Sequence, residues 1–560
     1  MILWHFGNTT VRSPLRLRDG LIVIKQAGLE GRLRGVENEL TFCKALGDYG
    51  VVNLQGDATY SVGRKWRSAM EKMGFLIPKL DKPYDYQQDE IGMIDAISEN
   101  GLRLVNSDSV AAWQECFLRS LASYAIPSIV EDRYKGEQFS PLRHTLNVMQ
   151  NLKILTNDSK LSIQEMGLFV QCSSSNENID HLIESIVAFR RDKETANNKK
   201  EFYRQYVSKI AKKYDKAEQT FRDYADTNFR YLKATGLVQS KGQGIAFVPE
   251  KQSLIEKLLS DFAPKEGLDY INAIIKGAEL PTDKKSEATH VLKDLIKILS
   301  DYGYKYDISE KPLNSAADIN IIRHEVEELI FQYKELDFAN RQANSTEEIA
   351  GYIDLLLDRK RKAITLTTGE EIKIPNSDAP AYFEWIVWRL FLAINSLNNK
   401  PWESRRFKID QDFLPVNCAP GNGPDLIFEY DDMVLIVEVT LTTSSRQEAA
   451  EGEPVRRHVA QFAENYVETN KRVYGLFLAI NIDTNTANTF RLGEWYLKDD
   501  RKIGLHIVPV NLESFKNFAL NKGRPQDVLS KLKASLMECR MHANLDAPEW
   551  KEKIASIFIR

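Results

Sequence analysis

The sequence is poor in the residues that define small secreted proteins and low-complexity chains. Its 560 residues include only 5 cysteines, 29 glycines and 19 prolines. The cysteines lie far apart with no Cys-x-x-Cys pair, which argues against a disulfide framework and against a zinc knuckle. Glycine and proline are too few for a collagen-like or disordered chain. These absences leave an ordinary folded protein.

The chain also lacks a long hydrophobic run and an excess of charge of one sign. No window approaches the ~20 apolar residues that a bilayer span requires. The first residues, Met1 to His5, lack the basic start and apolar stretch of a signal peptide. We therefore expect a cytoplasmic protein with no membrane partner. Lys and Arg number 75 against 79 Asp and Glu, a formal net charge of −4, but local basic patches decide whether a protein binds nucleic acid.

Length and composition predict several domains. Hydrophobic residues make up 43% and charged residues 28% of the chain, and ~150 residues per domain gives three or four domains. Changes of composition suggest a region 1–280, with parts at about 1–130 and 131–280. A charged helical linker is expected at 281–360 and a last domain at 361–560. The expected fold class is multidomain α+β.

Two segments of the first region have the pattern of a winged helix. A basic helix over 63–74 ends in glycine and is followed by a short strand over 75–78. A second helix ends at Gly236, and a hairpin with a Gly-rich turn follows over 238–248. Either unit alone is equally well explained as an ordinary helix–hairpin. Because both flank a Lys/Arg-rich helical stretch at 190–216, together they favour DNA binding.

Arginines of this region are the candidates for reading bases. Guanine presents two acceptors, O6 and N7, that a guanidinium matches in the major groove. Most of the other basic side chains are expected to contact phosphates. The candidate DNA-binding residues are Arg12, Arg16, Arg18, Arg64 and Arg67.

The last domain begins with a hairpin and a helix that carries an unusual carboxylate. The helix over 382–392 is apolar nearly all round, which predicts that it is buried. Glu384 stands within it, and a buried carboxylate is costly unless it is paired or binds a metal. One interpretation puts Glu384 at the solvent edge or beside an arginine. The other, which we favour, gives it a functional role.

Two further carboxylates lie at the ends of adjacent predicted strands. Asp425 begins one strand, and Glu438 ends the continuously apolar strand that follows the turn at Asp431 and Asp432. An antiparallel hairpin brings both to one end of the sheet, where they repel each other unless a divalent cation binds. Oxygen ligands suit Mg²⁺, which lowers the pKa of a bound water and neutralises charge on a phosphodiester. A hairpin without a metal is the alternative.

A histidine follows on the next predicted helix. Pro454 is expected in the first helical turn, with His458 one turn further on. A helix N-terminus favours anions, so a phosphate is expected to approach there. A histidine can exchange a proton at neutral pH. The alternative is a capping or core histidine.

Four motifs of this domain resemble a known family. Helix, antiparallel strands, helix and strand form the core of PD-(D/E)xK nucleases. Phe383–Trp385, Gly421–Asp425, Glu438–Thr440 and Glu453–His458 resemble the motifs of AlwI-like type IIS restriction endonucleases and their strand-nicking relatives. The likeness extends upstream through 230–237 and 249–251 and is weakest over the first hundred residues.

The resemblance implies an architecture and an activity. It implies a helical N-terminal recognition region with winged-helix-like units, a helical linker and a C-terminal PD-(D/E)xK α/β nuclease core with a mixed sheet. Cleavage of double-stranded DNA a few nucleotides outside an asymmetric site is expected. The implied cofactor is Mg²⁺, with Mn²⁺ as a substitute, and the implied system includes a cognate DNA methyltransferase.

The resemblance also assigns roles to residues. The catalytic set that it implies is Asp425, Glu438, Glu384, Glu451 and His458. Asp425, Glu438 and the carbonyl of Val439 would bind the metal. Thr440 stands where the wider superfamily has a lysine, so His458 or a second metal would have to stabilise the attacking hydroxide.

One active site cuts one strand. Double-strand cleavage then requires a transient homodimer or a second nuclease subunit, and without either the enzyme nicks. The sequence leaves two other functions open: a nuclease of DNA repair or mobile elements, and a non-catalytic DNA-binding regulator.

Overall fold

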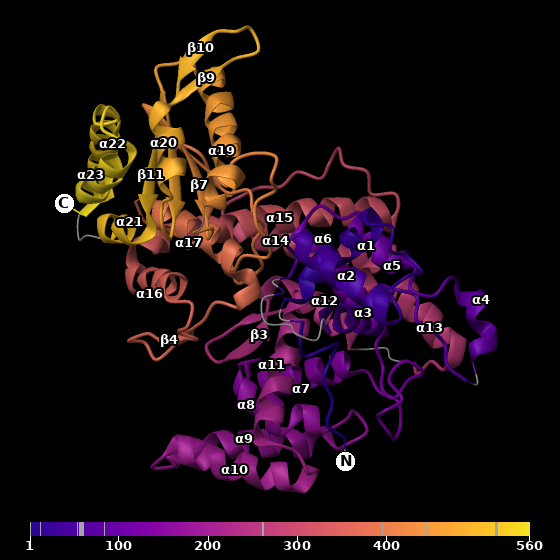
Figure 1. Ribbon diagram of the computed structural model, residues 1–560. Coiled ribbons are helices and arrows are strands. Elements are labelled where there is room, and N and C mark those ends of the chain that lie inside the picture. The colour runs from indigo at the N-terminus through magenta and orange to yellow at the C-terminus, as the bar shows by residue number, and fades with distance from the viewer. Residues whose placement is uncertain are drawn as a thin grey trace. The chain divides into compact units, whose positions relative to one another are not determined.

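The computed structural model describes residues 2–11, 13–52, 54, 61–82, 84–259, 263–394, 396–443, 445–520 and 525–559. The protein has a mixed α+β fold (Figure 1), which confirms the expected class. It divides into two units, 1–330 and 331–560, with the boundary inside one long helix. None of the helices in the described ranges has the length and apolarity that a membrane span requires.

Helices make up most of the first unit. Its only sheet within the described residues has three short antiparallel strands in the order β1-β3-β2: β1 (Leu161–Ser162), β2 (Val238–Ser240) and β3 (Gly244–Phe247). The helices are α1 (Leu17–Gln26), α2 (Val36–Asp48), α3 (Val62–Lys72), α4 (Gln88–Ile91), α5 (Glu99–Val105), α6 (Val110–Ser123), α7 (Pro141–Thr156), α8 (Ile163–Leu168), α9 (Ile179–Thr195), α10 (Lys199–Tyr214), α11 (Glu218–Ala234), α12 (Gln252–Leu258), α13 (Gly267–Lys276), α14 (Lys285–Asp301) and the long α15 (Ala316–Arg341).

The second of the two helix–hairpin segments forms as expected. α11 ends just before Gly236, whose φ of +69° is the left-handed conformation that terminates helices at glycine. β2 and β3 follow as an antiparallel hairpin. The sequence pattern therefore located the end of α11 and the hairpin correctly.

The first segment differs from the prediction in its strand. α3 ends at Lys72, and Gly74 has a φ of +68°, as expected of a closing glycine. The predicted strand over 75–78 is wrong, because Leu76 makes only an isolated bridge to Ile97. Pro78 has no N–H to donate, so the ladder does not continue along this segment.

The second unit is built around a mixed four-stranded sheet in the order β11-β8-β7-β6. β6 and β7 are antiparallel, whereas β7, β8 and β11 run parallel. The strands of this unit are β4 (Ile364–Thr365), β5 (Glu371–Ile372), β6 (Leu426–Glu429), β7 (Met433–Thr440), β8 (Arg472–Ala479), β9 (Glu494–Tyr496), β10 (Lys502–Gly504) and β11 (Ile507–Asn511). The helices are α16 (Thr346–Leu357), α17 (Ala379–Ile394), α18 (Pro401–Ser404), α19 (Arg446–Asn465), α20 (Thr484–Leu492), α21 (Leu512–Ala519), α22 (Pro525–Met541) and α23 (Ala547–Ile559).

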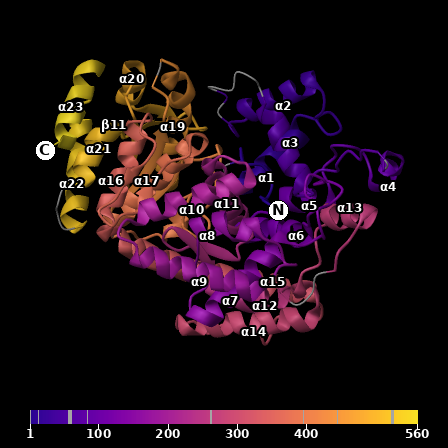
Figure 2. The same cartoon turned by 90° about the horizontal axis from the view of Figure 1, so that it is seen from below.

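Helices cover both faces of this sheet, as the apolar run of β7 predicts. Leu435 and Val437 point into the core that β7 forms with α17 and α22. Val434 and Ile436 point to the opposite face and pack against α19. Figure 1 and the view from below in Figure 2 show α22 and α23 on one side and α19 on the other. Alternate residues of β7 therefore face different helices, and this alternation decides where the site forms.

Candidate active site

The pairing of β6 with β7 brings Asp425 and Glu438 face to face. Leu426 pairs with Val437, so Asp425 and Glu438, one position further along each strand, stand opposite each other. Oδ2 of Asp425 also accepts a hydrogen bond of 2.9 Å from the backbone N–H of Val439. Because side chains alternate along a strand, Glu438 lies on the same face as Ile436, which is the face covered by α19.

Burial and mutual repulsion hold these carboxyl groups toward the protonated form. The pKa of Asp425 is raised well above its ordinary value, first by burial and then by the charge of Glu438. Burial raises the pKa of Glu438 to about 8, although the backbone N–H of Asp425 donates to it and acts in the opposite direction. Two adjacent buried carboxylates of this kind are stable in ionised form only beside a positive charge.

Glu384 adds a third carboxyl group from α17, on the other side of the sheet. It is buried, with 5% of its surface exposed, so it does not lie at the solvent edge. Its Oε2 accepts a hydrogen bond of 2.7 Å from the backbone N–H of Ala419. Its pKa is raised well above the ordinary value, first by burial and then by the charge of Asp425. The structure thus brings Glu384 into the electrostatic field of Asp425 and Glu438.

Glu451 and His458 come from α19, and the helix differs from the prediction. α19 begins at Arg446, so Pro454 lies inside it and not in its first turn. The proline costs one backbone hydrogen bond. The predicted position of Pro454 in the first turn is therefore wrong, and His458 lies far from the helix N-terminus, so that terminus gives no support to a phosphate site beside His458. Glu451 and His458, seven residues apart, share one face of the helix.

The same face of α19 places His458 beside Glu438. Nδ1 of His458 lies 2.6 Å from Oε1 of Glu438, and only 4% of the histidine is exposed. Burial lowers the pKa of His458 and is the main cause of the shift. When Glu438 is ionised, the neutral imidazole donates from Nδ1 and Nε2 carries no proton. Nε2 is buried with no hydrogen-bond partner among the described residues.

The pKa of Glu451 is also raised, by burial, and its charge raises the pKa of Asp425. All five residues of the predicted catalytic set therefore lie at one end of the β6–β7 hairpin. Three structural elements supply them: the hairpin, α17 and α19.

The oxygen donors of this site suit a hard divalent cation. Among the residues that the structure describes, no group of three or more His, Cys, Asp or Glu side chains is arranged so that it could hold a metal ion. Two carboxylates with a backbone carbonyl are nevertheless a fitting set for Mg²⁺, which usually keeps several waters. Burial raises the pKa values of Asp425 and Glu438, so their ionised forms are disfavoured, and Nε2 of His458 is unpaired among the described residues.

The candidate DNA-binding arginines have different surroundings. Arg18 donates to the carbonyls of Leu104 and Val105 at 3.1 and 3.0 Å, and its guanidinium lies 4.7 Å from the ring of Trp113. These contacts stabilise the packing of α1 on α5 and α6. Arg18 thus has a structural function within the first unit.

The other arginines differ in accessibility. Arg67 is buried and pairs with Glu39 at 3.2 Å. Arg16 is half-buried, and Arg64 is exposed on α3. Arg12 lies outside the described residues. Arg64 is therefore the described candidate with the most accessible side chain.

Sequence reasoning missed one cation near the carboxylates. Arg406 donates from Nη1 to the carbonyl of Pro424 at 3.1 Å and from Nη2 to Asn422. Its charge lowers the pKa of Glu438. The adjacent pair Arg405 and Arg406 is visible in the sequence, and a strand would direct the two side chains to opposite faces.

Comparison with known proteins identifies the family. A model of the AlwI restriction endonuclease family matches residues 71–518, well over half of the chain. No curated protein matches. Among solved structures, the small subunit of the heterodimeric restriction endonuclease R.BspD6I is 22% identical, with coverage of 38% of this chain and 96% of that chain and a TM-score of 0.28. The resemblance inferred from the motifs is confirmed by the family match. The chain belongs to the AlwI restriction endonuclease family and is a site-specific DNA endonuclease.

Proposed function

We propose that this endonuclease is Mg²⁺-dependent and that its active site consists of Asp425, Glu438, Glu384, Glu451 and His458. One observation carries this proposal: four carboxyl groups from three elements converge at one end of the sheet, and the pKa of each is raised. Folding places these groups together at a cost in free energy. Mg²⁺ held by these carboxylates would compensate for that cost.

The metal ligands that we propose are the carboxylates of Asp425 and Glu438 and the carbonyl of Val439. The backbone N–H of Val439 donates to Asp425. The group of Val439 that we propose as a metal ligand is therefore its backbone carbonyl oxygen. A bound Mg²⁺ would lower the pKa of a water and neutralise charge on the phosphodiester, and Mn²⁺ would substitute for it. Glu384 and Glu451 would orient waters at the edge of the site.

His458 is proposed to act through both of its nitrogens. Nδ1 lies 2.6 Å from Oε1 of Glu438, and it would donate to the ionised carboxylate and fix its position. Nε2 would accept a proton from the water that attacks phosphorus while the bond from phosphorus to the departing 3′ oxygen breaks. Its pKa, lowered by burial, keeps the imidazole neutral at neutral pH, and with Nδ1 donating to an ionised Glu438 the nitrogen free to accept a proton would be Nε2.

DNA recognition is assigned to the region 1–280, with 281–360 as linker and 361–560 as nuclease domain. The order α7, β1, α8, α11, β2, β3, with β1 paired to β3, supports a winged-helix-like unit in which α9 and α10 are an insertion. Arg64 is the base-reading candidate that its exposure favours. Arg12, Arg16, Arg18 and Arg67 are the remaining candidates.

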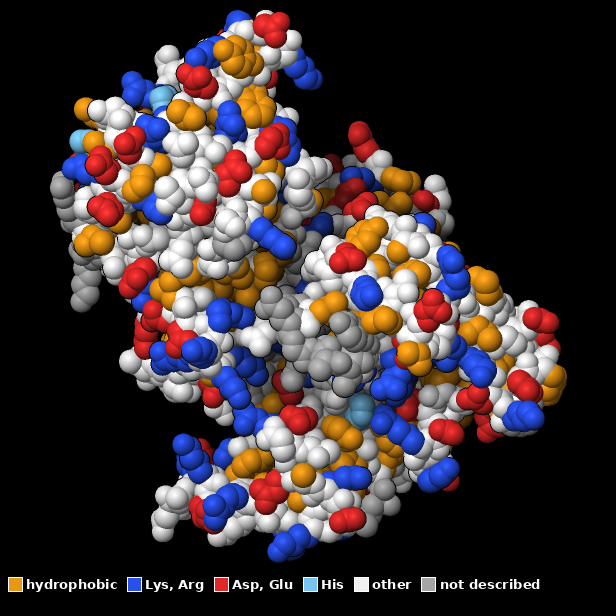
Figure 3. Space-filling model, in the orientation of Figure 1, with side chains coloured by type: hydrophobic (Ala, Val, Ile, Leu, Met, Phe, Trp, Pro, Cys, Tyr) orange, Lys and Arg blue, Asp and Glu red, His pale blue; other side chains and the backbone are white. Residues whose placement is uncertain are grey.

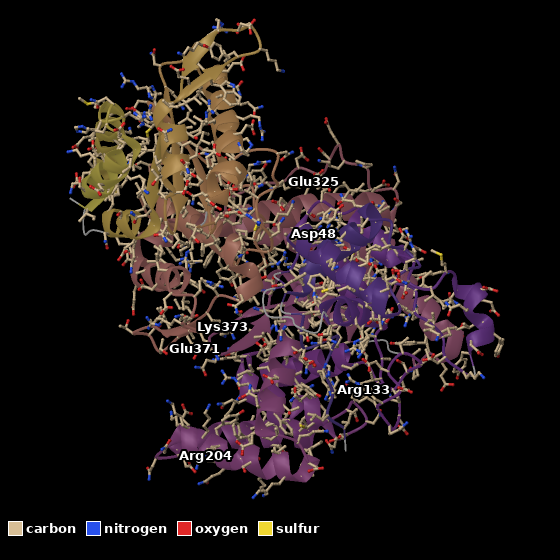
Figure 4. All side chains as sticks on the ribbon, in the orientation of Figure 1. Asp48, Arg133, Arg204, Glu325, Glu371 and Lys373 are labelled. Atoms are coloured by element: carbon tan, nitrogen blue, oxygen red, sulfur yellow. The ribbon has the colours of Figure 1, made fainter. Side chains whose placement is uncertain are left out.

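Phosphate contacts are assigned to one face of the inserted helix pair. We define the α10 surface as Lys209, Lys212 and Lys213 of α10 with Lys216 just after it. All four side chains are exposed, and none forms an ion pair with a described residue. Their spacing of three and four residues puts them on one face. Figure 3 shows basic side chains over this part of the molecule, and Arg204 on the same helix is labelled in Figure 4.

The opposite face of α10 is buried, which fixes the direction of the lysines. Val207 and Ala211 pack with Phe189 of α9 and Phe221 of α11, and α9 and α10 lie side by side in both ribbon views (Figures 1 and 2). A helix of 16 residues is ~24 Å long. Four unpaired cations on such a helix match the phosphates of a duplex in charge.

The mode of cleavage is proposed from the family. We propose type IIS cutting, a few nucleotides outside an asymmetric site, in a system that includes a cognate DNA methyltransferase. One active site per chain makes the isolated chain a nickase, and a transient homodimer or a second subunit makes it a double-strand cutter. Membership of a restriction family disfavours the repair or mobile-element nuclease, and the complete catalytic set disfavours the non-catalytic regulator.

Sequencing of cut ends tests this function. Plasmid DNA is incubated with the protein and Mg²⁺, and the ends are mapped on each strand separately. Ends at a fixed offset from one asymmetric sequence are expected, on one strand for a nickase. Asp425→Ala should bind the same sequence and leave the plasmid supercoiled. Normal cleavage by Asp425→Ala, or ends without a common sequence, would contradict the proposal.

A further inference from the structure

Arg406 lies next to Asp425, on the side of Asp425 that faces away from Glu438 and β7. Leu426 forms an antiparallel bridge with Arg405 on one side and pairs with Val437 of β7 on the other. One position along, Arg406 stands beside Asp425, which stands opposite Glu438. The backbone thus sets a cation next to the two carboxylates from the side away from β7.

Alternation along this segment separates the two adjacent arginines. Arg405 points toward the α17 side, where its Nε and Nη2 each lie 2.8 Å from an oxygen of the buried Glu335. Arg406, the next residue, therefore points to the other face, where Glu438 and His458 lie. Its charge lowers the pKa of both groups. Arg405 has a role in the core, whereas Arg406 belongs to the site.

The loop before Asp425 leaves space for this guanidinium. Nη1 of Arg406 donates to the carbonyl of Pro424 at 3.1 Å, and Nη2 donates to Oδ1 of Asn422. A β-carbon on Gly423 would overlap Nη1, so glycine is required for this approach. These bonds use two of the five N–H donors of an arginine. The other three have no hydrogen-bond partner among the described residues.

We propose that Arg406 is a catalytic residue that contacts a non-bridging oxygen of the scissile phosphate and stabilises the charge that develops there. The proposal rests on the proposed function, because it takes Asp425 and Glu438 as the centre of the site. It supplies the positive charge that is missing where Thr440 replaces the superfamily lysine. Arginine suits this function because its planar fork matches phosphate oxygens.

Cleavage of DNA with a single phosphorothioate at the scissile position tests the contact. Single-turnover rates are measured for the wild type and for Arg406→Gln on oxygen DNA and on each sulfur diastereomer. We expect Arg406→Gln to slow cleavage of oxygen DNA by about 10²- to 10³-fold, the usual loss for a donor that acts in the transition state. The sulfur effect is the ratio of the rate on oxygen DNA to the rate on one phosphorothioate diastereomer. We expect this ratio to be smaller in Arg406→Gln than in the wild type for one diastereomer, because two changes to the same contact are not additive.

Two further variants separate contact from loop support. Gly423→Ala keeps the charge of Arg406 but displaces its guanidinium, and it should slow cleavage and shrink the same sulfur effect. Arg457→Gln removes another nearby cation, which pairs with Glu453 at 3.0 Å, and should cleave within about threefold of the wild type. The concentration of Mg²⁺ at half-maximal rate should not change in Arg406→Gln, whereas loss of a metal ligand shifts it.

The outcomes that overturn the proposal are distinct. Cleavage by Arg406→Gln within about threefold of the wild type excludes a catalytic contact. A large loss with unchanged sulfur effects at both diastereomers means that Arg406 only supports the loop. If Asp425→Ala cleaves normally, the site itself is misassigned, and this result concerns the proposed function independently of Arg406.

Discussion

Nδ1 of His458 lies 2.6 Å from Oε1 of Glu438, and this hydrogen bond links the helix α19 to the strand β7 at the candidate active site. When Glu438 is ionised, the bond fixes the tautomer of the histidine, because a carboxylate can only accept and Nδ1 must then carry the proton. The other nitrogen, Nε2, is buried without a partner among the described residues. One side chain thus combines a positioning contact with an available proton acceptor.

The two functions of His458 can be separated by substitution. The amide nitrogen of His458→Asn lies near the position of Nδ1 and keeps the donor to Glu438, but the variant lacks Nε2. We expect His458→Asn to slow single-turnover cleavage by about 10²- to 10⁴-fold with little change in the Mg²⁺ requirement. His458→Ala should lose the same rate and also require more Mg²⁺, because Glu438 is no longer held. Near-normal cleavage by His458→Asn would show that Nε2 takes no proton.

Removal of one carboxylate should stabilise the metal-free protein. In Asp425→Asn a neutral amide replaces a group that is buried and repelled by Glu438, so thermal unfolding without metal should occur at a higher temperature than in the wild type. Added Mg²⁺ should stabilise the wild type, by about 2.7 kcal/mol at a hundredfold excess over its Kd, and should have little effect on the variant. Asp431→Asn, exposed in the turn of the same hairpin, is the control and should respond to Mg²⁺ like the wild type.

The core of the second unit could be predicted because its sequence patterns are local and unambiguous. The continuous apolar run of β7 requires cover on both faces, and the turn at Asp431 fixes the hairpin register that sets Asp425 opposite Glu438. The start of α19 could not be predicted in the same way. Proline is most common in a first helical turn, but packing of Val455 and Val459 against the sheet outweighs the hydrogen bond that Pro454 removes.

Other features depend on contacts between distant segments. Arg406 reaches the site through a bridge of its neighbour Arg405 to Leu426, and nothing local in the sequence predicts that bridge. Arg18 is a DNA-binding candidate by sequence, and its hydrogen bonds to the carbonyls of Leu104 and Val105 could not be predicted from the sequence. The contacts of such arginines depend on tertiary structure, which the spacing of residues in the sequence does not predict.

The α10 surface should account for part of the salt dependence of DNA binding. Replacing Lys209, Lys212 and Lys213 with glutamine should lower the slope of log K against log salt by roughly 0.9 for each phosphate that the variant no longer neutralises. Binding is measured with a labelled duplex that contains the recognition sequence, at several salt concentrations. The matched control replaces Lys285, Lys293 and Lys297, which are exposed on α14. Equal slopes for both triple variants would rule out a specific contact of the α10 surface with DNA.

The buried ion pair between Arg405 and Glu335 should be sensitive to removal of either partner. Arg405→Met removes the guanidinium that pairs with Glu335, which is fully buried. We expect urea unfolding to show a loss of about 3–5 kcal/mol. Arg501→Gln, which breaks an exposed pair with Asp499 at 2.6 Å, should change stability by less than about 1 kcal/mol. Similar effects of the two substitutions would mean that Glu335 finds another partner or water.

His144 should make the first unit less stable in mild acid. Burial lowers the pKa of His144 to about 4 from 6.5, so at intermediate pH the unfolded chain binds a proton that the folded protein does not. The contribution is therefore fully favourable above pH ~6.5 and is lost as the pH falls toward 4, by about 2 kcal/mol at pH 5. His144→Gln, which cannot titrate, should show a smaller difference between urea unfolding at pH 7 and pH 5. His290→Gln, at an exposed position, should keep the wild-type difference, and an unchanged difference in His144→Gln would mean that other groups dominate the acid response.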